Sequence, residues 1–200
     1  MAVNSDCFEG PGAATHYLAA RGFDPRTGSR SGGIVSPRRV TLPAGARLVR
    51  LFHDPTRQFG AWWATPWELE QIVAHFARGG PAFDEGRAHG RGLLHATLAV
   101  RHEWSGHSAD HLGRFVLVAL KQELEAYHGE GDSAPDGGHK HTLKPVSIVV
   151  GRRMRRARQL YLPECHRHLG AFEVLETGWT GSGLIAALRG MGAAPLSFER

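Results

Sequence analysis

One segment near residue 65 carries a complete set of helix signals and is the clearest element in the sequence. Thr65 suits the N-cap, Pro66 the first helical position, and Glu68 the closing position of a capping box. Apolar residues follow at helical spacing: Leu69, Ile72, Val73 and Phe76. The Gly-Gly-Pro of residues 79–81 stops the pattern, so the sequence predicts a helix of about three turns that begins at Pro66.

Elsewhere the patterned segments are short. Strand patterns occupy residues 47–52, 93–100, 145–150, 159–163 and 171–176. Further helices are expected at 13–20, 110–128 and 183–189. Residues 130–141 have the composition of a mobile loop. Because strands and helices mix without βαβ regularity, the predicted fold class is α+β, with a small mixed or antiparallel β core and flanking helices.

The first 39 residues are rich in Gly, Ser, Pro and Arg and have no sustained periodicity. They predict a flexible or loosely docked arm, followed by a single α+β domain at 40–200. No stretch has the roughly 18–20 apolar residues of a membrane span, and no secretory signal precedes the domain. We therefore expect a soluble protein, cytoplasmic at synthesis; delivery by a specialised secretion machine would leave no such trace.

The net charge is +5, and only Lys121, Lys140 and Lys144 of the 24 basic residues are lysines. Either codon bias in a GC-rich genome or an anion-binding surface explains this excess of arginine. The densest run lies at 152–158 and contains five arginines. It suits contact with nucleic acid or an acidic partner, and it equally suits a solvated edge strand.

Metal-ligating and nucleophilic residue types occur without the spacing of a known site. Cys165, His166 and His168 are close in sequence, and His139 and His141 form another group, but no second cysteine or ordered histidine pair accompanies them. The only other cysteine is Cys7, near the N-terminus. The sequence therefore predicts no metal site, and no motif supports a nuclease that would use His139 or His141.

Two adjacent tryptophans are the most informative feature. Trp62 and Trp63 follow Gly60 and precede the helix start at Thr65. Neighbouring residues of a strand point to opposite faces, so both rings cannot belong to one core. Either one ring offers a flat surface on which a planar ligand can stack, or it covers the beginning of the helix.

Three segments, in this order, resemble the motifs of the ADP-ribosyltransferase superfamily, including its NAD glycohydrolase toxins. They are LPAGARLVR at 42–50, GAWWATP at 60–66 and QLYLP at 159–163. The resemblance covers about residues 40–176 and implies a split β-sheet. It also implies NAD⁺ as the substrate and a bacterial or phage effector as the kind of protein, with a protein or nucleic-acid acceptor and a cognate immunity or antitoxin protein as partners.

The resemblance also implies residue roles. Arg50 or Arg47 would hold the pyrophosphate or ribose of NAD⁺. The nicotinamide side would be lined by Gly60, Trp62, Trp63 and Thr65. Gln159 would stand where the family usually has a catalytic Glu. These types suit cleavage of the nicotinamide–ribose bond, which needs an anchored pyrophosphate, a stacked nicotinamide and a polar group on the ribose.

Gln159 departs from the family pattern because an amide cannot act as a general base. Glu164 could supply the acid, or Glu123 and Glu125, which would lie on the surface of a helix. Otherwise the acceptor is water or a better nucleophile and no base is required. The alternative to an enzyme is a non-catalytic basic module that binds nucleic acid or an acidic partner through residues 152–158.

Overall fold

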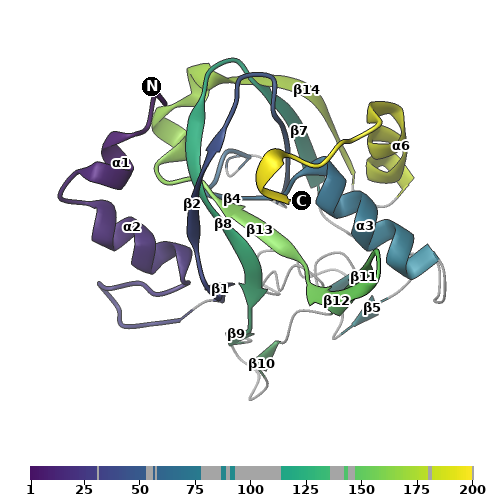
Figure 1. Ribbon diagram of the computed structural model, residues 1–200, viewed down its shortest axis with the longest axis horizontal. Helices are drawn as coiled ribbons and strands as arrows, with labels where there is room; N and C mark the ends of the chain where they lie inside the picture. Colours follow the sequence, from purple (N-terminus) through teal and green to yellow (C-terminus); the bar gives the residue numbers. More distant parts are fainter. Residues whose placement is uncertain are drawn as a thin grey trace.

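The computed structural model describes residues 1–30, 32–52, 56, 58–77, 87–88, 91–92, 114–135, 142–143, 147–179 and 182–199. Two antiparallel sheets form its centre, and helices lie on both sides of them (Figure 1). The expected α+β class with a small antiparallel core is confirmed. The strand pattern at 93–100 lies outside the described residues.

The larger sheet has five strands built around the nine-residue β8. The strands are β1 (Gly33–Ile34), β2 (Arg38–Leu42), β8 (Leu124–Asp132), β13 (Arg158–Tyr161) and β4 (Trp62–Trp63). β1 and β2 pair with one edge of β8, while β13 pairs with its other edge and with β4. β13 therefore lies between a long strand and a two-residue one.

The smaller sheet has three strands, with β7 in the middle. They are β3 (Arg47–Phe52), β7 (Arg114–Leu120) and β14 (Phe172–Trp179). Val49 of β3 and Ala64, just after β4, exchange two backbone hydrogen bonds of 2.8 Å. In the described part of the chain, this pair of residues connects the two sheets.

Three short hairpins complete the strands: β5 (Arg87–Ala88) with β6 (Arg91–Gly92), β9 (Ala134–Pro135) with β10 (Thr142–Leu143), and β11 (Ser147–Val150) with β12 (Arg153–Arg156). The last hairpin turns at Gly151, whose φ of +61° favours glycine. Residues 130–132, expected in a mobile loop, extend β8 instead, because β1 and β13 pair with them from both sides.

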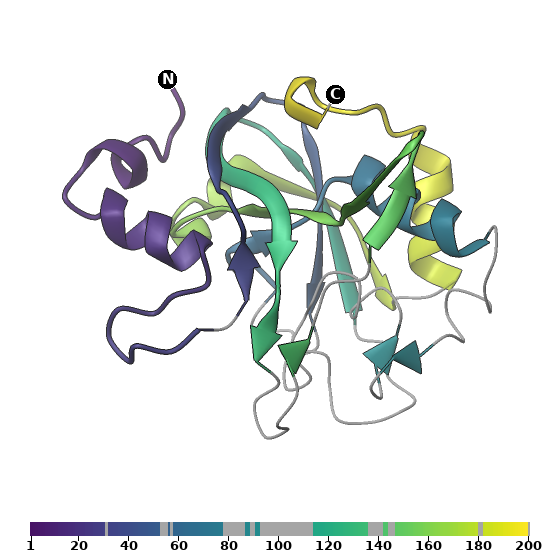
Figure 2. The same ribbon diagram turned by 60° about the horizontal axis from the view of Figure 1, so that its bottom comes forward.

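The helices are α1 (Asp6–Glu9), α2 (Ala13–Ala20), α3 (Pro66–Ala77) and α6 (Ser182–Met191). Short 3₁₀ turns occur at Cys165–Arg167, Leu169–Ala171 and Ser197–Glu199. α3 begins where its signals predicted, and Thr65 Oγ1 accepts a hydrogen bond from the Glu68 N–H at 3.2 Å. The expected helices at 13–20 and 183–189 are also confirmed. α1 and α2 lie on one side of the molecule, and α3 and α6 on the other (Figures 1 and 2).

The helix expected at 110–128 is wrong: this stretch holds β7 and the first part of β8. Four consecutive residues of β7, from Phe115 to Val118, are buried, because both faces of the strand are covered. A strand buried on both faces has the same unbroken apolar composition as a buried helix, so periodicity could not distinguish the two.

Several residues of the segment 1–39, for which composition predicted a flexible or loosely docked arm, pack against the β core as an N-terminal layer. Cys7, Phe8 and Ala20 are buried in one apolar cluster with Ile34 and Tyr127. The Asn4 side chain bonds both backbone groups of Glu125, at 2.8 and 2.9 Å. These contacts cross more than 100 residues of sequence, which explains why local composition did not reveal them. The expected boundary at 39/40 falls inside β2.

Candidate functional site

The three segments that carry the family resemblance are adjacent in the structure, although about 110 positions separate the first from the last. In β4, Trp62 pairs with Tyr161 and Trp63 pairs with Leu160 of β13. On the other side of this segment, Ala64 pairs with Val49 of β3. The tryptophan segment thus lies between the strand of Arg50 and the strand of Gln159, at the junction of the two sheets.

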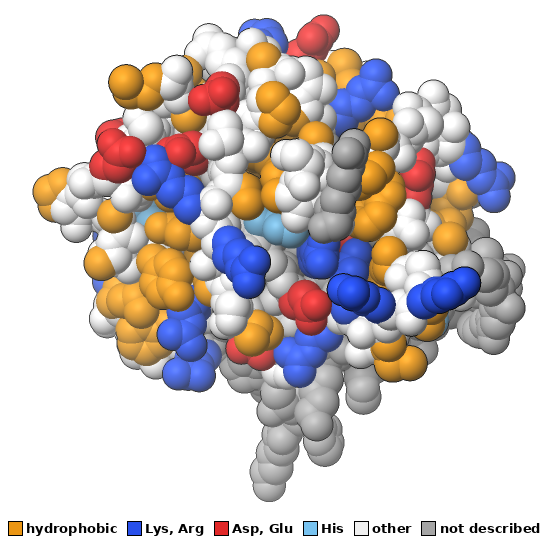
Figure 3. All heavy atoms as spheres, viewed as in Figure 1, with side chains coloured by type: hydrophobic (Ala, Val, Ile, Leu, Met, Phe, Trp, Pro, Cys, Tyr) orange, Lys and Arg blue, Asp and Glu red, His pale blue; other side chains and the backbone are white. Residues whose placement is uncertain are grey.

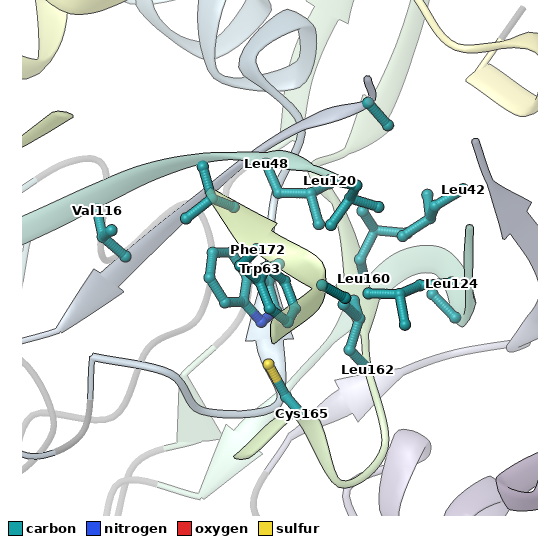
Figure 4. Packing of buried hydrophobic residues seen from close by; sticks show 14 of the residues in the cluster. Leu42, Leu48, Trp63, Val116, Leu120, Leu124, Leu160, Leu162, Cys165 and Phe172 are labelled. Atoms are coloured by element: carbon teal, nitrogen blue, oxygen red, sulfur yellow. The ribbon is translucent and has the colours of Figure 1, made fainter. Parts of the chain in front are cut away.

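The two tryptophans have different environments. Trp63 is 3% exposed and stacks on Phe172, with ring centroids 5.6 Å apart and an interplanar angle of 11° (Figure 4). Its Nε1 donates to the Gly60 carbonyl oxygen at 2.7 Å. Trp62 is half-buried on the opposite face, 5.1 Å from the Tyr161 ring. Trp63 is therefore a core residue, and only Trp62 has a face from which it could contact a ligand.

Arg50 of β3 lies directly beside this tryptophan segment. Its Nη1 donates to the Trp62 carbonyl oxygen at 2.7 Å. A Cβ on Gly60 would collide with the guanidinium, so glycine at this position allows Arg50 to lie against the backbone. Burial lowers the pKa of Arg50 to about 10, which leaves it a cation at neutral pH. A bound anion would offset the cost of burying this charge.

Arg47 does not join this group. It lies three positions from Arg50 on β3, and strand alternation places the two side chains on opposite faces. Arg47 is exposed, and its Nη1 lies 3.4 Å from the Met191 carbonyl oxygen at the end of α6. Of the two arginines considered for the pyrophosphate, the structure places only Arg50 next to Trp62.

Gln159 lies on the same face of β13 as Tyr161, the residue that contacts Trp62. Its register partner on β8 is Gly129. A Cβ built on Gly131, two residues further, would approach the Gln159 Nε2 to 2.8 Å. The amide therefore occupies space that Gly131 leaves over β8.

The acidic residues considered as alternatives to Gln159 either bond to arginines or lie exposed at the surface. Glu125 of β8 forms two hydrogen bonds with Arg39, at 2.7 and 2.8 Å, and lies four residues from Gly129, or about 13 Å along the strand. It belongs to a strand and not to the helix surface that the sequence suggested. Glu123 is exposed in the turn before β8. Glu164 bonds Arg167 at 2.6 Å.

A buried carboxylate that the sequence did not single out for function lies next to β13. Glu68 of α3 is 1% exposed and forms a two-pronged ion pair with Arg155, at 2.5 and 2.6 Å. Its Oε1 also accepts the Arg158 backbone N–H at 2.8 Å. The capping-box role expected for Glu68 is thus replaced by a contact with a residue 90 positions away, which no local pattern could reveal.

The C-terminal turn completes this buried polar cluster. The Thr65 hydroxyl donates to Glu199, whose other oxygen accepts the Leu196 N–H at 2.8 Å. Arg158 donates to the Glu199 carbonyl oxygen at 3.0 Å. Burial raises the pKa of the Glu199 carboxyl. Thr65, expected to line the nicotinamide side, is covered by Glu199 and acts here as a helix cap.

The basic run at 152–158 forms the hairpin strand β12 and the beginning of β13, and basic side chains gather over it (Figure 3). Arg152 and Arg153 are exposed, but Arg155 is paired with Glu68 in the interior. Arg156 lies 3.5 Å from Asp132. The run therefore contributes partly to internal structure and partly to the surface.

His139 and His141, considered for a nuclease, lie outside the described residues. No helix in the described part of the chain is long and apolar enough to cross a membrane.

No protein-family model matches the chain, and no curated protein matches it significantly. Among solved structures it is similar to "Rhs1-CT in complex with cognate immunity protein RhsI1", with a TM-score of 0.42 and 13% identity over 73% of this chain and 83% of that one. It is also similar to "Structure of Tse6 in complex with Tsi6", with a TM-score of 0.34 and 16% identity over 83% of each chain. Similarity at this level carries no information about activity, so function is argued from the residues of this chain.

Proposed function

We propose that this protein binds NAD⁺ and cleaves its nicotinamide–ribose bond, with water or an acceptor molecule receiving the ADP-ribose. One observation carries the proposal: the tryptophan segment pairs with the strand of Gln159 on one side and with the strand of Arg50 on the other, and Arg50 donates to the Trp62 carbonyl oxygen. Three separate motifs thus come from adjacent strands where the two sheets join.

Each residue has a role that its environment supports. Arg50 is fixed by the Trp62 carbonyl and Gly60, so its guanidinium is preorganised to hold the pyrophosphate. Trp62 would stack on the nicotinamide ring. Gln159 would hydrogen-bond the ribose hydroxyls while positive charge develops on the ribose. The bond to nicotinamide breaks with its electron pair, so the base leaves as a neutral molecule and the cationic ribose accepts the nucleophile.

The absence of a general base at position 159 favours water over arginine as the acceptor. Two buried carboxylates lie near β13: Glu68, whose charge is paired with Arg155, and Glu199, which accepts from the Thr65 hydroxyl. Water attacking a ribose cation loses its proton readily to solvent, whereas a guanidinium acceptor must first be deprotonated. Hydrolysis of NAD⁺ is therefore the form of the activity that these residues support best.

Such an activity would consume a dinucleotide that the producing cell needs. We expect the chain to act as an effector of the toxin type, made in the cytoplasm, delivered by a secretion machine, and held inactive before delivery by a cognate immunity protein. The two similar solved structures are themselves complexes, and one of them contains a cognate immunity protein.

The test is release of free nicotinamide from NAD⁺ by the purified chain. Arg50→Ala and Gln159→Ala should each reduce release roughly 100-fold or more, the cost of removing one preorganised charge-stabilising group. Arg47→Ala is the matched control: it removes an arginine from the same strand but from the opposite face, and should leave release unchanged. Circular dichroism checks that each variant is folded.

Absence of nicotinamide release, with and without cell lysate as a source of acceptors, would contradict the proposed reaction. Release that persists in both Arg50→Ala and Gln159→Ala would contradict the residue assignment.

A further inference from the structure

A second group of functional side chains lies away from the proposed NAD⁺ site. Asp6 and Cys7 of α1 meet His168, which follows the 3₁₀ turn Cys165–Arg167. One carboxylate oxygen, the Cys7 Sγ and one His168 ring nitrogen all lie within 4.8 Å of one another. The three donors come from two segments about 160 positions apart, so only the fold brings them together.

These three groups are of the types that Zn²⁺ prefers: a thiolate, an imidazole and a carboxylate. A tetrahedral Zn²⁺ with ligand bonds of about 2.0–2.3 Å places its ligand atoms about 3.5 Å apart. The three donor atoms must therefore approach one another by about 1 Å. The exposed Asp6 and half-buried His168 side chains can make this movement by rotation. A fourth coordination position is left for water.

The backbone holds His168 in a defined place. Glu164 adopts a left-handed conformation with φ of +48°, unusual for a residue other than glycine, and its carboxylate bonds Arg167 at 2.6 Å. The His168 N–H donates to the Cys165 carbonyl oxygen at 3.1 Å, and the His168 carbonyl accepts the Ala171 N–H at 2.9 Å. A turn fixed at both ends is a suitable carrier for a metal ligand.

We propose that Asp6, Cys7 and His168 bind a Zn²⁺ ion that fastens the N-terminal layer to the connection between β13 and β14. The ion would act as a structural clamp, because it joins a segment of only two short helices to the rigid strand framework. This site is independent of the proposed reaction on NAD⁺.

The chain supplies its own matched controls. Cys165 is a second buried cysteine, but it packs beneath Trp63 in the core (Figure 4). His166 is exposed, two positions before His168, and lies outside the cluster of three donors. Cys7 and His168 therefore each have a counterpart of the same residue type nearby that should not bind the ion.

The experiment measures metal content and thermal stability of the full chain, without an affinity tag, after chelator treatment and addition of equimolar Zn²⁺. We expect one Zn²⁺ per chain and a rise in Tm that chelator reverses. Cys7→Ser and His168→Gln should lose the bound ion, whereas Cys165→Ser and His166→Gln should retain it. Co²⁺ added to the unaltered protein should give thiolate-to-metal absorption, which tests Cys7 without any substitution.

Three results would overturn the proposal: no Zn²⁺ retained at equimolar metal, full retention in both Cys7→Ser and His168→Gln, or equal loss in His166→Gln. A Co²⁺ complex without thiolate absorption would also overturn it. None of these results bears on nicotinamide release, so the two proposals fail separately.

Discussion

His128 is a polar residue in the interior of this protein. His128 is 8% exposed and packs on Phe198 of the C-terminal turn, with ring centroids 4.7 Å apart. Its Nε2 is a buried atom for which no hydrogen-bond partner is found among the described residues. Burial, together with the positive charges of Arg158 and Arg155, lowers the pKa of His128 to about 4. His128 is therefore neutral in the folded protein at physiological pH.

We predict that His128 makes the protein sensitive to mild acid. Its pKa is about 4 when folded, against 6.5 for the ordinary side chain, so the unfolded chain binds the extra proton between these values. The stability that the neutral His128 ring contributes is fully present above pH 6.5. The free energy of unfolding then falls by roughly 3 kcal/mol as the pH drops toward 4. Urea unfolding at a series of pH values measures this loss.

His128→Gln provides the control, because it removes the titrating ring. This variant should lose clearly less stability than the unaltered protein over the same interval. Glu199 acts in the opposite sense, since its raised pKa favours the folded state as the carboxyl becomes protonated. Equal pH dependence in both proteins would contradict the role of His128.

At the scale of elements, β4 is only two residues long, and this determines how α3 is held against β13. β4 ends at Trp63, which pairs with Leu160, so Arg158 of β13 has no partner residue in β4. The Glu68 carboxylate takes the Arg158 N–H that a longer β4 would have bonded. The same carboxylate holds Arg155, whose side chain is 10% exposed. The Glu68 side chain thus accepts the Arg158 N–H at the edge of the sheet and also neutralises the charge of Arg155.

We expect Arg155→Ala to destabilise the protein by about 3–5 kcal/mol, because it leaves the Glu68 charge buried without its partner. Arg153→Ala, an exposed position on the same strand, should change stability by no more than about 0.5 kcal/mol. Equilibrium unfolding in urea gives both values. Similar losses in the two variants would show that β12 is held by its strand pairing and not by the ion pair.

For the whole molecule, the N-terminal layer closes the aromatic face of the larger sheet. Phe8 and Tyr17 both contact the Tyr127 ring, with centroids 4.9 and 5.7 Å away. Trp62 and Tyr161 pack against the same cluster. The arm therefore shields one end of the face that carries Trp62, and its docking connects the stability of the fold to the environment of the proposed site.

Phe8→Ala should cost about 3–5 kcal/mol, since it removes a buried aromatic ring that the arm needs for docking. Tryptophan fluorescence should shift to longer wavelength, because undocking exposes Trp62 to water. Val3→Ala is the control at an exposed position of the same arm and should change stability by no more than about 0.5 kcal/mol. A loss below about 1 kcal/mol for Phe8→Ala would mean that the arm docks without this contact.

The sequence by itself determined the elements whose signals are local. The cap at Thr65 and Pro66, the strand at 47–52 and the helix at 183–189 depend on neighbouring residues, and the structure confirms them. Adjacency in the chain also required Trp62 and Trp63 to face opposite ways. Only the tertiary structure decided which ring is buried, because that depends on Phe172, more than 100 positions away.

Dependence on residues far apart in the sequence also explains the other places where the structure differs from what the sequence predicted. Burial on both faces made β7 look like a helix, and the partners of Glu68, of Asn4 and of Cys7 lie 87 to 161 positions from them. Ion pairs, docking contacts and metal donors are set by distance in space, and a sequence records only distance along the chain. The fold brings such residues together: in the part of the chain that the structure describes, the backbone pair of Val49 and Ala64 joins the two sheets.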